Sequence, residues 1–457
     1  MLVRALALVL AALPFAACRD REPSAAPPNH SQTATTASAV PGVASSGGTT
    51  SSAAVEQAEL QNSKGESVPF HAARGDSAVA ARVPVGTRVS VLERSGDGAW
   101  LRVRAPDGTE GWITRRYAAL GPKDAGGSRS GSELLPQGSI WRSRADCEAA
   151  LAAGKRLPRP SGVARLATWN VRWFPDGKPG GRASEVPTDL AWLGCALAWL
   201  DVDAVAVQEF KLNDRARDAV KTLLQTLDGH THGHWAADFD DCPNLDAQHV
   251  GIFHDERRVK ADKPLTLAAL NPHGDACKDN LRPGLGVYLK FPGGLDLHFV
   301  SVHAKSGPER RSIDLRERSL RALDSAQTEL GKAHADPDVL VAGDFNTMGC
   351  KECSPAIGAE DELGRTDSAL SKLTAPMRRL RASKPCSEYH AQHGTLLDHF
   401  FASRAFVELP ADATSVVSGV CGEAACQVLP KREKLEAEER LSDHCPVVLD
   451  VPDRDQD

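Results

Sequence analysis

The 457-residue sequence lacks an apolar segment long enough to cross a membrane, and it lacks an excess of basic residues. The apolar run nearest the N-terminus extends from Ala5 to Ala17 and is interrupted by Pro14, whereas a membrane-spanning helix needs about 20 apolar residues. The formal net charge of -6 at pH 7 excludes a global positive field that would attract nucleic acid. Any site for a polyanion must therefore be local, and the length of the chain indicates two or three domains.

The N-terminal apolar run has the features of a secretory signal. Arg4 precedes the run and small residues end it, which is the usual pattern of such signals. The tetrapeptide FAAC at residues 15–18 is similar to a bacterial lipoprotein cleavage box, with Phe where Leu is usual. We therefore expect residues 1–18 to be a signal peptide, and the exported protein to be a membrane-anchored lipoprotein of a bacterial cell envelope, attached through lipidated Cys18. The alternative is plain secretion after cleavage nearby.

The remaining cysteines indicate disulfides. An even number of cysteines in an exported chain favours disulfide pairing, although the sequence does not determine which residues pair. The spacing of Cys350 and Cys353 also occurs in zinc sites, but no second pair with matching spacing or suitable histidines accompanies it. The ten cysteines that we expect to form disulfides are Cys147, Cys195, Cys242, Cys277, Cys350, Cys353, Cys386, Cys421, Cys426 and Cys445.

The N-terminal third divides into a tether and a small domain. Residues 19–66 are rich in Ala, Ser, Thr, Pro and Gly, so they are predicted to be a disordered tether. Residues 67–120 contain short alternating strands separated by turn signals, which predicts a small all-β barrel. The order PVGTRVSVLE…GAWLRVRAPDGTEGWI resembles a bacterial Src-homology-3-like domain, and this resemblance implies a cell-wall or peptide ligand. Trp100 and Trp112 are candidate ligand contacts, but we expect at least one of them to pack in the core.

The rest of the chain reads as an α/β domain. Residues 121–163 are predicted to be a linker with a short helix from Ala145 to Ala153. Residues 164–452 alternate apolar strands with amphipathic helices, which indicates packed sheets covered by helices, and residues 453–457 are a short tail. The helices are expected at Leu190 to Leu200, Arg215 to Leu227 and Arg311 to Ala335.

Polar residues recur where the apolar strands end. Carboxylate, amide and imidazole groups gathered at one edge of a sheet suit phosphoryl transfer with a hard cation. The residues at these positions are Asn170, Gln208, Glu209, His303, Asp344, Asn346, Asp398, His399, Ser442, Asp443 and His444.

The motifs that contain these residues resemble those of the endonuclease/exonuclease/phosphatase superfamily. TWNV, VQEF, HAKSG, GDFN, LLDHFF and LSDHCP occur in the order and approximate spacing of that superfamily over residues 164–452. One such tetrapeptide arises often by chance, whereas six in the right order are specific. The resemblance implies the deoxyribonuclease I-like fold, a four-layer α/β sandwich of two packed mixed sheets flanked by helices, and metal-dependent phosphodiester hydrolysis.

The resemblance also implies the metal ligands. Glu209 matches the principal metal ligand, with Asn170 and Asp443 beside it. These side chains offer only oxygen donors, which suits Mg²⁺, Mn²⁺ or Ca²⁺.

The catalytic roles follow in the same way. Asp344 matches the residue that orients and deprotonates the attacking water, and Asn346 the amide that holds a phosphate oxygen. His444 matches the imidazole that contacts the scissile phosphate, and Asp398 the carboxylate that sets its tautomer. His303 occupies the place of a second histidine near the leaving group; the alternative is a structural residue at a strand end.

The substrate is less clearly indicated. Arg172 lies near the position at which the abasic-site repair branch has an acidic residue, so DNA repair is not expected. Lys305, Arg310 and Arg311 could contact flanking phosphates of DNA or RNA, whereas Asp314 and Glu317 indicate an exposed, salt-bridged helix face from Arg311 onward, which also carries Arg316, Arg318 and Arg321.

We therefore expect a monomeric nuclease. The alternatives are a phospholipid or phosphoinositide phosphoesterase on the same fold, and a catalytically inactive cell-surface binding protein. The second alternative is disfavoured because every motif position keeps chemically competent residues.

Overall fold

The computed structural model describes residues 57–62, 66–74, 78–95, 100–120, 134–177, 186–390, 392–429 and 435–456. The predicted signal peptide, the predicted lipid attachment site at Cys18 and most of the predicted tether lie outside the described residues. Among the helices of these ranges, none combines the length and the hydropathy that a membrane-spanning segment requires.

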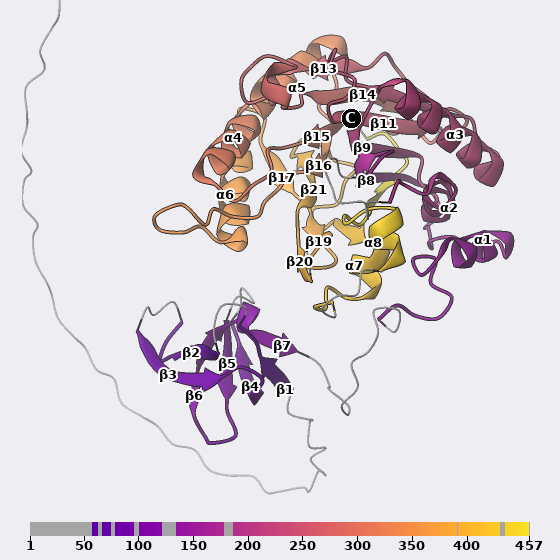
Figure 1. The fold of residues 1–457 in the computed structure, drawn as a ribbon. Coiled ribbons are helices and arrows are strands. Elements are labelled where there is room, and N and C mark those ends of the chain that lie inside the picture. Colours follow the sequence, from indigo (N-terminus) through magenta and orange to yellow (C-terminus); the bar gives the residue numbers. More distant parts are fainter. Residues whose placement is uncertain are drawn as a thin grey trace, which may run out of the picture.

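The small domain is an antiparallel, curled sheet (Figure 1). Its strand order is β3-β2-β6-β5-β4-β1-β7, with β1 antiparallel to β7 so that Ala58 lies opposite Leu120. A 3-10 helix, η1 (Arg115–Tyr117), precedes the last strand. The strands are β1 (Gln57–Leu60), β2 (Ser67–His71), β3 (Val79–Pro84), β4 (Arg88–Arg94), β5 (Trp100–Arg104), β6 (Glu110–Thr114) and β7 (Ala118–Leu120).

Two sequence-based expectations about this domain are wrong. The domain begins at β1, which lies within the predicted tether; Leu60 is buried in the core, but four residues carry too short an alternation to be recognised. Trp100 and Trp112 are both only partly buried, because strand alternation places Leu101 and Ile113 in the core and the two indoles on the other face. There the ring of Trp100 meets His71 edge-on, with ring centroids 5.7 Å apart.

The large domain contains two mixed sheets, as predicted. In the first sheet β8 is parallel to β9 and β18 is parallel to β22, and the other pairs are antiparallel. Its strands, in spatial order, are β10 (Trp235–Phe239), β11 (His249–Asp255), β9 (Ala204–Phe210), β8 (Val163–Phe174), β23 (Val447–Pro452), β22 (Thr414–Val417) and β18 (Arg381–Ala382).

In the second sheet only β15 and β16 are parallel among the paired strands of the described residues. Its strands, in spatial order, are β12 (Lys260–Ala261), β14 (Gly284–Lys290), β15 (Asp296–His303), β16 (Val339–Asp344), β21 (Asp398–Ser403) and β17 (Met377–Arg379), with β13 (Leu265–Leu267) also paired to β14. A separate hairpin is formed by β19 (Glu388–His390) and β20 (His393–Thr395).

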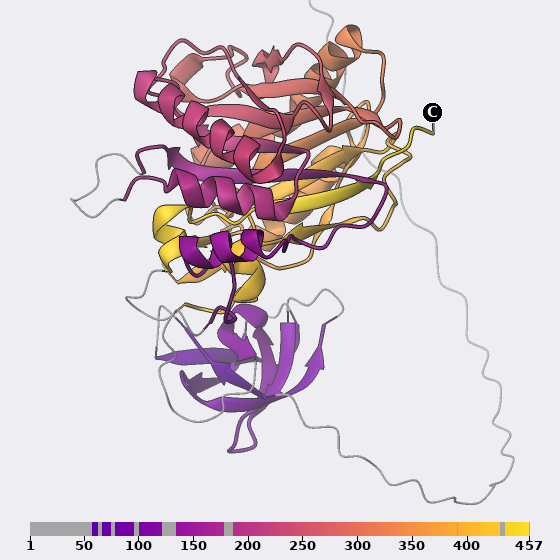
Figure 2. The same cartoon turned by 90° about the vertical axis from the view of Figure 1, so that its right-hand side faces the viewer.

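The two sheets pack face to face between helices, which gives four layers (Figures 1 and 2). Strand β15 shows why, since Leu297 and Phe299 join the core between the sheets, whereas Val300 and Val302 pack beneath the outer helices. Helices α1 (Arg144–Ala152), α2 (Leu190–Leu200) and α3 (Asp214–Thr231) cover the first sheet, and α4 (Arg310–Arg321), α5 (Leu323–Ala333) and α6 (Ala359–Ser371) cover the second. Short segments α7 (Gly419–Glu423), α8 (Glu436–Arg440), η3 (Ala268–Leu270) and η4 (Lys278–Asn280) lie in the connections.

The predicted linker is partly a component of the large domain. Helix α1 matches the predicted short helix within one residue at each end, and the disulfide Cys147–Cys195 joins it to α2. Trp141 is 2% exposed, and the Nε1 of Trp192 donates to the carbonyl of Ile140 at 2.9 Å. The domain therefore begins near residue 134, about thirty residues before the predicted boundary.

All ten predicted cysteines form disulfides. Because Cys350 and Cys353 bond to each other, they are not a zinc pair. The predicted helix from Arg311 to Ala335 is two helices, α4 and α5, which are separated at Ala322. The disulfides are Cys147–Cys195, Cys242–Cys277, Cys350–Cys353, Cys386–Cys426 and Cys421–Cys445.

Candidate active site

The strand register brings the predicted site residues to one edge of the sandwich. His303 lies opposite Asp344 in the parallel pair β15 and β16, and Asp344 lies opposite Asp398 at the start of β21. In the other sheet Asn170 of β8 lies opposite Gln208, the residue before Glu209 in β9. Side chains far apart in the sequence therefore converge, because the ends of β8, β9, β15 and β16 and the start of β21 lie at the same edge.

Asp344 is the centre of the site and is 1% exposed. Its Oδ2 accepts a hydrogen bond from Nδ2 of Asn170 at 3.0 Å, and it lies 3.4 Å from Nε2 of His303 and 3.8 Å from Nε2 of His444. Its Oδ1 accepts from the backbone N–H of Asn346 at 2.9 Å. Burial raises the pKa of Asp344 to about 7, with the charge of Asp398 adding to the shift and that of His444 opposing it.

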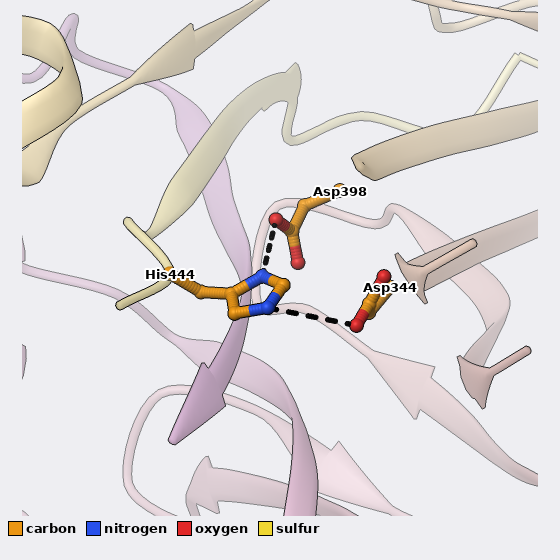
Figure 3. A group of neighbouring side chains, drawn as sticks. All are labelled: Asp344, Asp398 and His444. Carbon is orange, nitrogen blue, oxygen red and sulfur yellow. Dashed lines mark hydrogen bonds and ion pairs between the residues drawn. The ribbon is translucent and has the colours of Figure 1, made fainter. Parts of the chain in front are cut away.

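His444 lies between two carboxylates (Figure 3). Its Nδ1 is 2.9 Å from Oδ2 of Asp398, and that same oxygen accepts from the hydroxyl of Ser387 at 2.7 Å. Burial disfavours the charged imidazole, but Asp398 and Asp344 outweigh it and hold the pKa of His444 well above its ordinary value. Asp344, Asp398 and His444 lie close enough to hold a metal. Because each imidazole nitrogen faces a carboxylate, we interpret the group as an Asp–His–Asp array, with a hydrogen bond from His444 to Asp398 and an ion pair between His444 and Asp344.

Glu209 and its neighbours form a separate set of oxygen donors. The Oε1 of Glu209 accepts from Nδ2 of Asn170 at 3.2 Å, and its Oε2 accepts from the backbone N–H of Trp173 at 2.9 Å. Glu209 has a φ of 69°, a strained conformation for this residue type that is often found at functional sites. Burial raises the pKa of Glu209, and the like charge of Asp443 adds to the shift.

These residues fit a divalent cation. A partly buried carboxylate that is destabilised by desolvation and by a neighbouring carboxylate is stabilised when a cation binds. Asn170 and Asp443 supply further oxygens, and the set contains no nitrogen or sulfur donor, which suits Mg²⁺, Mn²⁺ or Ca²⁺. The amide nitrogen of Asn170 faces the carboxylates, and its Oδ1 accepts from the backbone N–H of Arg172 at 3.0 Å, so the amide would have to rotate and give up that bond to present its oxygen to a cation.

His303 and Asn346 flank Asp344. Burial lowers the pKa of His303 well below its ordinary value, with the charges of Arg282 and His444 adding to the shift. Its Nδ1 is buried and has no hydrogen-bond partner among the described residues. Asn346 follows β16, and its Nδ2 donates to the carbonyl of Ala304 at 3.1 Å.

Two further charged residues at the site escaped sequence analysis. Arg282 precedes β14, and its Nε is buried without a hydrogen-bond partner among the described residues. Burial lowers its pKa, while the carboxylates of Glu209 and Asp344 act against this shift. Glu388 of β19 is 7% exposed, and it pairs through the backbone with His444. Burial raises the pKa of Glu388 to about 8. The charge of His444 opposes this shift, and the charges of Asp443 and other carboxylates add to it.

The basic residues after His303 differ in how far they are exposed to solvent. Lys305 is partly buried near Arg282, whereas Arg310 and Arg311 are exposed at the start of α4. The exposed ion pair between Arg321 and Glu317, at 3.7 Å, agrees with the predicted salt-bridged face, on which Arg318 is also exposed. Arg316 contradicts that prediction, because it is 2% exposed and faces the interior. Its spacing from Ile313 and Leu320 places it on the apolar stripe of the helix.

Comparison with known proteins gives two family matches. The family model described as bacterial SH3 domain matches residues 72–119. The model described as Endonuclease/Exonuclease/phosphatase family matches residues 167–444. Among functionally curated proteins, no match is found.

Solved structures with a similar fold have low sequence identity. An endonuclease/exonuclease/phosphatase from Bacteroides vulgatus is 13% identical, covering 63% of this chain and 98% of that chain, with a TM-score of 0.43. TDP2 of D. rerio, complexed with a single-strand DNA product, is 16% identical, covering 64% and 99%, with a TM-score of 0.42. A mannosyl-6-phosphatase of Bacteroides thetaiotaomicron is 17% identical, covering 63% and 99%, with a TM-score of 0.42. At these values the similarities assign neither substrate nor activity.

Proposed function

Because the chain belongs to the endonuclease/exonuclease/phosphatase family, we propose that it is an exported, metal-dependent phosphodiesterase that hydrolyses nucleic acid. The observation that carries this proposal is the buried array in which His444 lies between Asp398 and Asp344, directly beside the oxygen donors at Glu209. A structural histidine needs one satisfied partner, whereas this arrangement joins a base, an acidic imidazole and a cation-binding set in one place.

The residues divide the chemistry between them. Asp344, with a pKa of about 7, accepts a proton from the attacking water near neutral pH. Charged His444 and the amide of Asn346 stabilise the negative charge that develops on the non-bridging phosphate oxygens. His303, on the other side of Asp344, is the candidate for assisting the leaving oxygen. A divalent cation bound by Glu209, Asn170 and Asp443 would supply further charge neutralisation at the phosphate.

A polyanionic substrate is favoured by cations beside the site. Burial lowers the pKa of Lys305, and the nearby charge of Arg282 adds to this shift while that of Glu309 opposes it. Like charges held together in the absence of a ligand are stabilised when an anion binds between them. Arg310 and Arg311 extend this cationic region to the exposed start of α4.

The location is proposed from the N-terminal sequence. Cys18 as a lipid anchor, followed by the tether, would hold the enzyme at the bacterial cell envelope, acting as a monomer. Trp100 and Trp112, on the outer face of the small domain, are available for a cell-wall or peptide ligand. Mass spectrometry of the mature N-terminus tests the anchor, and a mature protein without lipid would contradict it while leaving export open.

The activity is tested with the purified chain lacking its signal peptide. Plasmid DNA, RNA and vesicles containing phosphoinositide or sphingomyelin are incubated with Mg²⁺, Mn²⁺ or Ca²⁺ and with excess chelator. We expect hydrolysis of nucleic acid that chelation abolishes. Faster turnover of either lipid would replace the nuclease proposal, and no turnover of any substrate would favour a binding protein.

A second experiment tests the phosphate contacts. Arg310→Gln with Arg311→Gln should raise KM on duplex DNA, and each lost contact should lower the log-log salt slope by about 0.9. A small soluble diester serves as the control, because it has no flanking phosphates. Arg318→Gln is the matched exposed variant, with an unchanged salt slope as the expected result.

A further inference from the structure

Arg316 of α4 and Glu362 of α6 form a buried ion pair between two helices. The Nε of Arg316 lies 2.6 Å from Oε1 of Glu362, and its Nη2 lies 2.9 Å from Oε2. The side chains of Arg316 and Glu362 are 3% and 6% exposed. This two-bond geometry fixes the plane of the guanidinium relative to both helices.

The pair also holds the backbone of two loops. Nη1 of Arg316 donates to the carbonyls of Lys305 at 3.1 Å and Gly307 at 2.8 Å. Its Nη2 donates to the carbonyl of Gly349 at 3.2 Å, and Oε2 of Glu362 accepts from the N–H of Gly349 at 2.6 Å. All five N–H groups of a guanidinium are therefore used.

The two loops contain or follow the predicted catalytic groups. The first loop follows His303, and the second follows Asp344 and contains Asn346. They bond to each other where Nδ2 of Asn346 donates to the carbonyl of Ala304. Asn346 has a φ of 52°, in the left-handed region that Asn adopts more readily than most residues. A shift of either loop would therefore move Asn346 relative to Asp344.

We propose that the Arg316–Glu362 pair is a positioning device for the active site, which sets the distance between the loop after His303 and the loop that carries Asn346. It touches no reacting atom. A buried ion pair is weak evidence for stability, because desolvation offsets much of the attraction and apolar replacements of similar volume are often tolerated. Its effect on the reaction rests on the proposed phosphodiester hydrolysis.

The chain offers a matched control at the other end of β8. The Nε and Nη2 of Arg165 lie 2.6 Å and 2.9 Å from the two oxygens of Asp450, and its remaining N–H groups donate to the carbonyls of Leu157, Leu200 and Pro158. Arg165 is 1% exposed. It lies five residues before Asn170, or roughly 17 Å along the strand. The arginine of the control pair thus has the same bonding pattern away from the site, and its partner Asp450 is 27% exposed.

The experiment compares two double variants. One combines Arg316→Met with Glu362→Leu, and the control combines Arg165→Met with Asp450→Leu. Thermal midpoint, and kcat and KM on a small soluble diester with Mg²⁺ or Mn²⁺, are measured for each. We expect both double variants to fold, and only the Arg316/Glu362 variant to lose kcat, by up to about 10²-fold with little change in KM, the scale of a misplacement of about 1 Å. Equal kcat in wild type and the Arg316/Glu362 variant would overturn the proposal.

Hydrogen exchange gives a readout that does not require turnover. Peptides covering residues 304–309 and 346–351 should lose protection in the Arg316/Glu362 variant and keep it in the control. Arg316→Lys retains the charge without the planar fork, so it should show the same local loss if the apolar variant fails to fold. Unchanged protection of both loops would refute the positioning role even if the wild type proved inactive, whereas an inactive wild type with the expected loss of protection would refute only the proposed hydrolysis.

Discussion

The Nδ1 of His444 lies 2.9 Å from Oδ2 of Asp398, a carboxylate with no solvent exposure. Asp398 accepts the N–H of Nδ1, so the other ring nitrogen, Nε2, is directed towards Asp344. The orientation of the charged imidazole, and its tautomer whenever it is neutral, are thus set by a residue that need not contact the substrate.

Replacing Asp398 with Asn tests this relationship. The amide removes the charge that raises the pKa of His444, and it allows the ring to adopt another tautomer. We expect turnover to fall by at least about 10²-fold and the His444 pKa, followed by NMR, to fall as well. Asp367→Asn, which removes an exposed partner of Arg379, should leave both unchanged. Wild-type turnover in Asp398→Asn would contradict the assignment.

Cation binding should depend on Glu209. A ligand that binds only the folded state at 100 times its Kd stabilises the protein by about 2.7 kcal/mol. Mn²⁺ or Mg²⁺ should therefore raise the thermal midpoint of the wild type, and Glu209→Gln should remove most of that increase. Asp218→Asn, which removes an exposed carboxylate of α3, serves as a control for the general effect of charge. An equal increase in Glu209→Gln would show that the cation binds elsewhere.

His399 should make stability depend on pH. Burial lowers its pKa to about 3 from the ordinary 6.5, with the charge of Arg379 adding to the shift. Between these values the unfolded chain binds the proton and the folded chain does not, so stability is lost as pH falls from 6.5 towards 3. One group contributes up to about 1.4 kcal/mol per pH unit in this window. In urea unfolding measured from pH 4 to 7, His399→Gln should reduce the dependence of the unfolding free energy on pH. The exposed control His393→Gln should leave that dependence unchanged.

The N-terminal boundary of the large domain can be tested by truncation. A chain that begins at residue 134 should unfold cooperatively and keep its turnover of a small diester. A chain that begins at residue 164, with Cys195→Ser, lacks Trp141 and the Cys147–Cys195 disulfide, and losing such a disulfide costs about 2–5 kcal/mol. Denaturation and gel filtration should show this chain to be destabilised or aggregated. Equal stability would show that residues 134–163 are a true linker.

The strand-end residues were predictable because an apolar strand followed by a polar group is a local pattern. His303 and Asp344 each end a buried strand, and the order of six motifs completed the assignment. Arg282 and Glu388 were not predictable, because one precedes a strand and the other lies in a short hairpin. Their importance arises only from contacts across the sheets.

Arg316 shows a different failure. Acidic neighbours in the sequence favoured an exposed helix face, yet the spacing from apolar residues on both sides already placed it in the interior. Disulfide connectivity was open for a related reason, since loop closure depends on the tertiary path of the chain.

The antiparallel pairing of β1 with β7 places the first and last strands of the small domain side by side. The chain therefore enters and leaves the domain at the same edge, and residues 57 and 120 lie close together. The domain thus adds little to the end-to-end distance of the chain, and replacing it with another domain of this kind would leave that distance almost unchanged. A pulling force applied at residues 57 and 120 would load the hydrogen bonds between β1 and β7 one after another, which is the unzipping geometry. The pair would therefore separate at a lower force than strands loaded in shear.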